Sequence, residues 1–395
     1  MSGTAIERDV FFRFYACEVS YFSAKVRPAL RYKRLPFIEI LPTPEAYRQV
    51  IRPRTGLSFI PVVVTPEDEA LQDTSEILDT LEARFPEPPL YPTTPVQRVT
   101  AYLWELYADE FLIIPALHYR WSFPESEAKA RADFAAFTGD ADSAGRFADR
   151  IKAFTGPMGI LPETIPAIEE HTRVLLDRLS AHFQQHRFLL GDAPSLADCA
   201  LMGPLYPHLY LDAVPGRLLR ETAPQVCRWI ERMNHPHPVD PPLAPGVTPR
   251  VERGPVTPAW CWLADDALAP TMRPLLELIG RDAVPLLLDT VRAFDEWADR
   301  RPRGEEAPRA IGMHRTRLRG VSFDRYTSSY LPWMVQRPLD AYQALTPGER
   351  TAVDRALAGT GCEALLAHVP RHRVTKRRFK IVLAETETRD RDRES

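Results

Sequence analysis

The clearest pattern of apolar and polar positions lies in residues 57–85, where a β-branched run precedes a turn, a second short run and an amphipathic stretch. Val62–Val64 predicts a buried strand, because consecutive β-branched side chains are stiff and pack well on a pleated surface. Asp73 can cap the following helix, with Glu76 completing a capping box. Apolar residues recur at helical spacing at Ile77, Leu78, Leu81 and Phe85.

The residues before this stretch predict two strands, each followed by a helix. Val10–Tyr15 is aromatic and suits a strand, and Phe37–Leu41 predicts a second one. The segment that begins at Ser20 has a helical pattern, although Pro28 should kink it. Glu45–Ile51 predicts a short helix. The order βαβα, followed by two strands and a helix, predicts an α/β domain.

After the proline-rich linker at residues 87–95, few segments have a strand pattern, and most have a helical one. Val96–Leu117 predicts a long aromatic helix, and Ile165–His186 predicts another. Ser195–Met202 begins a third helix, with Asp198 placed for an acidic variant of the capping box. These patterns predict an all-α second domain.

The remaining third of the chain also has mostly helical patterns, and we assign it no chemistry. Leu275–Trp297 predicts a helix with a break after Gly280, and Thr346–His368 predicts one interrupted near Gly359. A final strand is predicted within Arg371–Ala384, whose basic residues we interpret as a solvated face.

Composition narrows the class of protein. A chain of 395 residues should form two or three domains. Its net charge of −3 and pI near 6.4 argue against a protein that binds nucleic acid or membranes mainly through its charge. No apolar run has signal-peptide or membrane-spanning character, so we expect a cytoplasmic protein. His182 and His186 lack the glutamate of HExxH and are interpreted as a solvated pair, so no metal is expected. The scattered cysteines favour a reducing compartment; they are Cys17, Cys199, Cys227, Cys261 and Cys362.

Residues 60–74 combine an open backbone edge with a helix N-terminus. Pro61 removes one ladder donor where the strand begins, and a cis bond to Ile60 would turn that residue's backbone outward. The N-terminus of the helix that begins at Thr74 attracts a carboxylate, and Asp73 attracts an ammonium group. Together these groups suit a zwitterion next to a peptide backbone, such as the γ-glutamyl end of glutathione.

These residues resemble the glutathione S-transferase superfamily, in which a cis-proline precedes the third strand and an acid and a hydroxyl begin the third helix. Here Asp73 and Thr74 stand at that pair, with Thr74 where serine is commoner. A second motif, FLLGDAPSLADCALM around Ser195, resembles the capping motif of the family's helical domain. The resemblance covers about the first 235 residues and implies an α/β thioredoxin-like N-terminal domain followed by an enlarged all-α C-terminal domain. It also implies a homodimer.

The resemblance implies that the chain binds glutathione and adds its thiolate to an apolar electrophile, or uses it in a related ether cleavage or isomerisation. A non-catalytic binding or scaffold protein of the same fold stays open. The expected organisation is a thioredoxin-like domain at residues 1–86, a linker at 87–95, a transferase-type helical domain at 96–247, an extension at 248–385 and a disordered tail at 386–395.

The segment SYFSAKVR overlays the family's serine-type motif, which places Ser20 at the glutathione thiol and Ser23 one turn later. The alternative is that Ser20 only caps the helix. Cys17 and Ser20 form a CxxS pattern, so a glutaredoxin-like thiol oxidoreductase that uses Cys17 is a further alternative.

The resemblance also places an electrophile pocket between the domains. Aromatic residues at helical spacing are more often core than ligand contacts, and nothing specifies the second substrate. The candidate lining residues are Tyr102, Trp104, Tyr107 and Trp121.

Two positions depart from the family pattern. Arg52 and Pro53 stand where an Asn-Pro pair is common, and Phe59 occupies a glutathione-binding position that is often basic. Residues that can replace the missing contact to the glycyl end are Lys33, Arg48 and Arg54.

Overall fold

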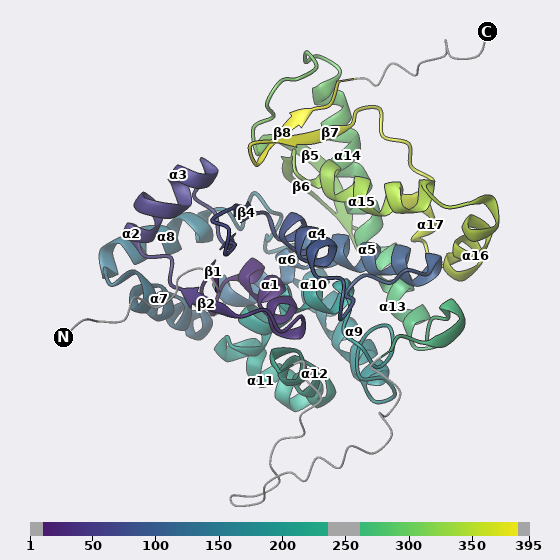
Figure 1. Cartoon of the computed structure of the whole chain (residues 1–395), viewed down its shortest axis with the longest axis horizontal. Helices are drawn as coiled ribbons and strands as arrows, with labels where there is room; N and C mark the ends of the chain where they lie inside the picture. The colour runs from purple at the N-terminus through teal and green to yellow at the C-terminus, as the bar shows by residue number, and fades with distance from the viewer. Residues whose placement is uncertain (1–10, 236–260, 386–395) are drawn as a thin grey trace, which may run out of the picture.

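A mixed four-stranded sheet lies near the N-terminus of the fold (Figure 1). The structure is a computed structural model that describes residues 11–235 and 261–385, so Val10 of the predicted first strand and the predicted tail at 386–395 lie outside it. The strands follow the order β2-β1-β3-β4, with β1 parallel to β2 and the other pairs antiparallel. Their bounds are β1 Phe12–Tyr15, β2 Phe37–Ile40, β3 Val62–Val64 and β4 Ala70–Gln72.

Helices cover this sheet and complete the predicted thioredoxin-like domain. One face of the sheet packs on α1 and α4 through a core that includes Phe14, Val26 and Ile77. Pro28 lies inside α1, which continues past it. The helices and helical turns are α1 Tyr21–Tyr32, α2 Pro44–Ala46, the π-helix η1 Tyr47–Ile51, α3 Arg52–Thr55 and α4 Thr74–Arg84.

The second domain is a helical bundle whose members pack around α5 and α10. The predicted single helix over Val96–Leu117 is two helices in the structure, because the chain turns at Phe111 and Leu112 between α5 and α6. The bounds are α5 Pro95–Glu110, α6 Ile113–Trp121, α7 Pro124–Thr138, α8 Ala141–Ala153, α9 Ile165–Phe183, α10 Leu196–Pro204, the π-helix η2 Leu205–Tyr210, α11 Ala213–Thr222 and α12 Pro224–Asn234.

The described part of the extension, residues 261–385, packs against α5 and shares the hydrophobic core of the bundle. The break expected after Gly280 is a π-helical turn, where a Cβ on Gly280 would lie 2.1 Å from the carbonyl oxygen of Thr360. The elements are η3 Ala264–Asp266, α13 Met272–Leu278, η4 Ile279–Ala283, α14 Val284–Ala298, β5 Ala310–Leu318, β6 Val321–Ser328, α15 Leu331–Gln343, α16 Pro347–Leu357, α17 Glu363–Leu366, β7 Val374–Arg377 and β8 Lys380–Leu383.

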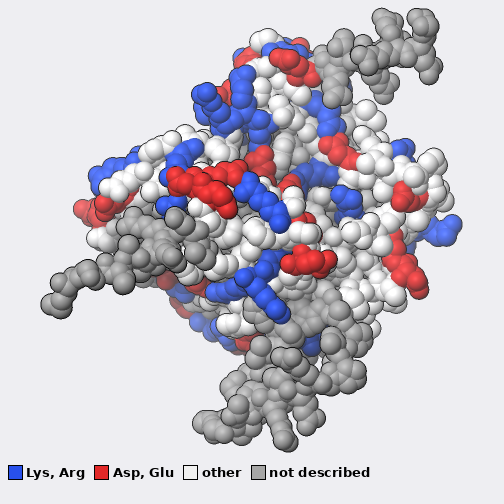
Figure 2. All heavy atoms as spheres, in the orientation of Figure 1, with Lys and Arg blue, Asp and Glu red and all other residues white. Residues whose placement is uncertain are grey.

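Two antiparallel hairpins, β5–β6 and β7–β8, distinguish the extension from an all-helical one. Only a final strand within residues 371–384 was expected, and the structure has two strands there. The β7–β8 hairpin, yellow in Figure 1, lies beside α4. Arg373 and Lys380 form exposed pairs with Asp340 and Glu306, as expected for a solvated face. Lys376 is the exception, because its side chain is 7% exposed and pairs with Asp73. Over the face in Figure 2, acidic and basic side chains are interspersed, as the small net charge implies.

His182 joins the helical domain to the extension. The prediction of a solvated histidine pair is wrong for this residue, which is fully buried between the hydroxyl of Thr271, 2.8 Å away, and the carbonyl of Phe188, 3.2 Å away. Burial lowers the pKa of His182 to about 4. The folded protein therefore keeps a neutral imidazole at pH values where the unfolded chain binds a proton.

We expect this histidine to contribute to acid sensitivity. The unfolded chain gains a proton below about pH 6.5 and the folded chain only near pH 4, so His182 should cost up to about 3 kcal/mol of stability as the pH falls across that window. Urea unfolding of His182→Gln should show a weaker loss between these pH values than the wild type. Thr271→Val keeps the imidazole and serves as the control; equal pH dependence in all three proteins would contradict the assignment.

Candidate functional site

Two neighbouring cavities lie beside the thioredoxin-like domain. The first cavity, about 280 Å³, lies between the N-terminus of α4 and the extension. The second cavity, about 530 Å³, lies between the thioredoxin-like domain and helices α6 to α8. Phe22 and Ile60 line both cavities. The two cavities are therefore adjacent across these side chains.

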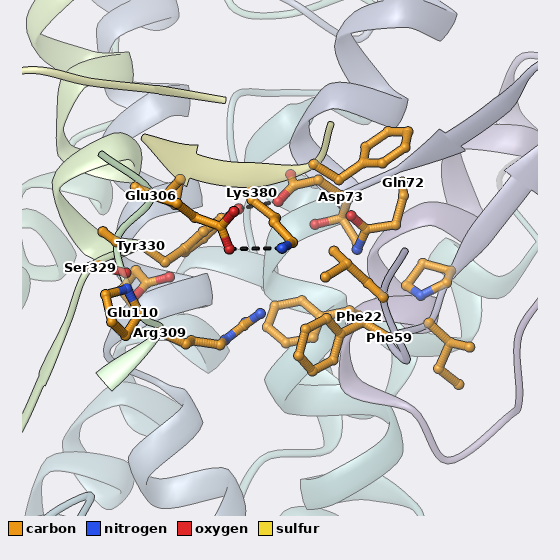
Figure 3. Close-up of a pocket in the computed structure, with 18 residues that line it drawn as sticks. Phe22, Phe59, Gln72, Asp73, Glu110, Glu306, Arg309, Ser329, Tyr330 and Lys380 are labelled. Carbon is orange, nitrogen blue, oxygen red and sulfur yellow. Dashed lines mark hydrogen bonds and ion pairs between the residues drawn. The ribbon is translucent and has the colours of Figure 1, made fainter. Parts of the chain in front are cut away.

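The first cavity brings together all five residues predicted to bind glutathione: Phe59, Ile60, Pro61, Asp73 and Thr74. The Ile60–Pro61 peptide bond is cis, as the resemblance implied. Figure 3 shows Phe59, Gln72 and Asp73 on one side of the cavity, and Glu306, Arg309 and Tyr330 on the other. The second group comes from the extension, which sequence reasoning left without a role.

Asp73 caps α4 as predicted, but its remaining oxygen contacts the extension. Oδ1 accepts hydrogen bonds from the backbone N–H groups of Ser75 at 3.0 Å and Glu76 at 3.5 Å. Oδ2 accepts one from the Tyr330 hydroxyl at 2.6 Å and lies 2.8 Å from Lys376 Nζ. Burial opposes ionisation of Asp73, but Lys376 and Tyr330 hold its pKa below the ordinary value. Asp73 is thus an anion that is already partnered.

Glu76 does not form the expected reciprocal half of the capping box. Its carboxylate lies 3.5 Å from Lys376 Nζ instead, and the helix cap rests on Asp73. Lys376 therefore lies close to two carboxylates at the N-terminus of α4.

Phe59 is 41% exposed and carries the Arg309 guanidinium 4.4 Å from its ring centroid. This places a cation from the extension over the position that is often basic in the family. Of the three proposed substitutes, Lys33 is buried and binds the carbonyl of Phe85, and Arg54 pairs with Asp68. Those two predictions are wrong, because both cations are held away from the cavities.

Glu110 lines the first cavity from the end of α5 and was not found from the sequence. Burial and the nearby charge of Asp109 raise the pKa of Glu110 to about 7. At neutral pH this carboxyl is only partly ionised. Nothing in the local sequence signals its role, because its position depends on how the extension docks.

The second cavity places Ser20 beside an apolar chamber. The Ser20 hydroxyl accepts a hydrogen bond from the backbone N–H of Ser23 at 3.2 Å, so it caps α1 while its side chain lines the cavity. Both interpretations of Ser20 are therefore compatible with its place. Apolar lining comes from Phe22, Ile60, Ile113, Leu117, Trp121, Phe134, Phe137, Phe147 and Ile151.

The charged side chains that line the second cavity are cationic, and most of its other polar groups are hydroxyls. Arg48, Arg52 and Arg150 lie at its exposed rim, and among the described residues no Asp or Glu lines it. The indole N–H of Trp121 and Nδ1 of His208 have no hydrogen-bond partner within the described structure. The cavity can thus hold an apolar molecule and still offer it polar contacts and an anion-binding rim.

Four predicted site residues do not reach this cleft. Ser23 is fully buried on the inner face of α1 and lines neither cavity. Trp104 and Tyr107 are core residues, whose polar atoms contact Met272 and His171. Tyr102 is half-buried under the guanidinium of Arg337. The aromatic spacing on α5 therefore marks packing, and Trp121 is the one predicted pocket residue that lines the second cavity.

Cys17 lines the second cavity but is a poor nucleophile. It is 4% exposed, and burial raises the pKa of its thiol to about 12. A disulfide exchange enzyme needs a thiolate near neutral pH. This environment opposes the glutaredoxin-like alternative.

The chain matches two family models in consecutive order. Residues 14–89 match the glutathione S-transferase N-terminal domain, and residues 162–236 match the glutathione S-transferase C-terminal domain. No curated protein matches the sequence. Among the described residues, no helix is long and apolar enough to cross a membrane, and no cluster of three or more His, Cys, Asp or Glu is placed to hold a metal ion.

Solved structures that resemble the chain include several transferases at low identity. A glutathione S-transferase from Rhodospirillum rubrum has 20% identity and a TM-score of 0.39, over 56% of this chain and 86% of that one. The beta-etherase LigF from Sphingobium has 18% identity and a TM-score of 0.41, over 56% and 94%. A transferase from Methylobacterium radiotolerans in complex with glutathione sulfonate has 22% identity and a TM-score of 0.37, over 61% and 99%.

Proposed function

Because the chain belongs to the glutathione S-transferase superfamily, we propose that it binds glutathione across the two cavities and transfers the thiolate to an apolar electrophile. The observation that carries this proposal is that Phe22 and Ile60 line both cavities. A tripeptide lying along Ile60 has room for its γ-glutamyl end near Thr74 and for its sulfur near Ser20. Arg48 and Arg52 at the rim of the second cavity are the candidates to hold its C-terminal carboxylate.

Ser20 is proposed to stabilise the glutathione thiolate. Its hydroxyl can donate a hydrogen bond to the sulfur, and the N-terminus of α1 adds a partial positive charge. Lowering a thiol pKa from about 8.5 to about 6.5 raises the thiolate fraction at neutral pH about 25-fold. The weaker base is less nucleophilic, which leaves about a threefold net gain. Most of the acceleration must then come from holding the electrophile beside the sulfur.

The second cavity suits that task. Its apolar wall excludes water from the electrophile. Ether cleavage and isomerisation use the same thiolate, and the choice among these reactions depends on the electrophile. By the same family resemblance, we propose that the protein is a cytoplasmic homodimer. Analytical ultracentrifugation tests the oligomeric state.

The test of this function is the ionisation of bound glutathione. We expect ultraviolet titration of the complex to give a thiol pKa well below the solution value of about 8.5, and Ser20→Ala to abolish that shift. The variant should also lose about 1 kcal/mol of stability with its helix cap. Ser23→Ala is the matched control, because Ser23 is buried away from both cavities and should leave the thiol pKa unchanged.

A second candidate function is favoured by the contacts of Asp73. Because Tyr330 and Lys376 already partner this carboxylate, the chain also fits a non-catalytic protein whose extension covers the site. The thiol titration separates the two candidate functions. If the thiol of bound glutathione has its solution pKa and Ser20→Ala does not change it, the non-catalytic function is favoured.

A further inference from the structure

We propose that Lys376 stands in for a ligand's ammonium group at Asp73, so that the first cavity takes acyl-cysteinyl thiols without an α-ammonium at least as well as glutathione. This inference rests on the proposed function and concerns which tripeptide-like thiols the cavity selects. The ligand class is a cysteinyl peptide whose N-acyl group ends in a carboxylate. Lys376 is then a specificity-determining residue.

The acceptor capacity of Asp73 carries the inference. A carboxylate offers about four lone-pair positions, and Asp73 has four close partners: two backbone N–H groups on Oδ1, and Tyr330 and Lys376 on Oδ2. An incoming ammonium would have to compete with Lys376 for Oδ2 of Asp73. It would also approach the positive charge of Lys376, and like charges at close range repel.

Lys376 is built into its position. Its side chain is 7% exposed, and Nζ lies 3.3 Å from the ring centroid of Trp333. The strand that carries it is fixed to α15 by Gln336, whose side chain accepts from the backbone N–H of Val374 at 2.8 Å and donates to its carbonyl at 2.9 Å. The cation is therefore part of the packed structure and not a chance surface contact.

The remaining groups of the first cavity favour a carboxylate more than an ammonium. The N-terminus of α4 carries a partial positive charge, although Asp73 caps the N–H groups of Ser75 and Glu76, and the Arg309 guanidinium faces the cavity from the extension. Glu306 is paired with Lys380 at 2.8 Å. Glu110 is the one other carboxyl that lines the cavity among the described residues, and Figure 3 shows it near Ser329, across the cavity from Gln72.

The test compares two thiols by isothermal titration calorimetry: glutathione, and its des-amino analogue with a glutaryl group in place of the γ-glutamyl group. For the wild type we expect the analogue to bind as tightly as glutathione, within about threefold. In Lys376→Met, Asp73 regains an open acceptor, and glutathione should gain about tenfold relative to the analogue, the size of one charge-assisted hydrogen bond. Methionine keeps an unbranched side chain of similar length beside Trp333 and removes the charge.

Matched variants isolate the effect. Arg377→Met changes an exposed neighbour on the same strand and should leave the ratio of affinities at its wild-type value. Tyr330→Phe removes the other contact on Asp73 Oδ2 and should shift the ratio toward glutathione by less than Lys376→Met. Circular dichroism confirms that each variant is folded, and the wild-type comparison stands even where a variant is not.

Three outcomes would overturn the inference. A wild-type preference for glutathione of tenfold or more would show that the ammonium is recognised and would leave the proposed function intact. Loss of that preference in Glu110→Gln would assign the recognition to Glu110. Failure of both thiols to bind the wild type and Lys376→Met would overturn the proposed function together with the inference.

Discussion

Replacing Lys25 with methionine should lower the free energy of unfolding by about 3–5 kcal/mol at pH 8, because a buried cation that balances two carboxylates is removed. Lys25 is fully buried on α1, and its ammonium lies 2.7 Å from Glu105 and 2.5 Å from Asp109 on α5. Arg337 of the extension also pairs with Glu105, so the same cluster joins all three parts of the chain.

The pH dependence of this loss provides a second check. Burial raises the pKa of Asp109 to about 7, whereas Arg337 and Lys25 outweigh burial and hold the pKa of Glu105 at about 2. Without Lys25, Asp109 is a buried carboxylate with no cation beside it, and protonation of Asp109 removes the cost of that charge. Urea unfolding should therefore show a smaller loss in Lys25→Met at pH 5 than at pH 8.

The control is Lys129→Met, which removes a partly exposed lysine paired with Asp133 one turn away on α7. Such pairs contribute about 0.3–0.5 kcal/mol. If Lys25→Met were no more destabilising than Lys129→Met, the cluster would not hold the domains together as described.

Replacing Asp198 with alanine should cost about 4 kcal/mol of stability. The carboxylate accepts from the backbone N–H groups of Leu189 and Ser195, the Ser195 hydroxyl and the indole N–H of Trp229, at 2.8–3.0 Å. Alanine leaves these buried donors without acceptors, and each unsatisfied donor costs about 1–3 kcal/mol before the site relaxes.

Asp198→Asn is the informative partner variant. Asparagine keeps one oxygen for the donors but turns an N–H group toward the others, so its loss in thermal or urea unfolding should lie between the wild type and Asp198→Ala. Burial raises the pKa of Asp198 to about 6, and an amide avoids that cost of burying a charge. Equal losses for both variants would mean that the donors do not depend on this oxygen.

Local sequence patterns were enough to predict the elements that border the first cavity on the side of the thioredoxin-like domain. The β-branched run at Val62–Val64 and the cap at Asp73 are short-range features, and both occur where they were expected. The capping motif at Ser195 and Asp198 was also confirmed. Such features depend on neighbours within a few residues, which a sequence displays directly.

The docking of the extension could not be predicted, because its contacts join residues far apart in the chain. Lys376 reads as one basic residue in a basic run, yet it is buried against Asp73, some 300 positions earlier. The β5–β6 hairpin was missed because its first strand alternates weakly and carries a half-buried His and two exposed Arg residues. On α5, Trp104 and Tyr107 turned inward because α9 and α13 cover that face.

The crystal structure of the chain with glutathione tests the central claim most directly. The account predicts that the tripeptide lies along Ile60, with its γ-glutamyl carboxylate at the N-terminus of α4, its sulfur within hydrogen-bond distance of the Ser20 hydroxyl, and Lys376 still on Asp73. The absence of ligand density in both cavities at saturating glutathione would contradict the account. So would a glutathione sulfur that lies away from Ser20.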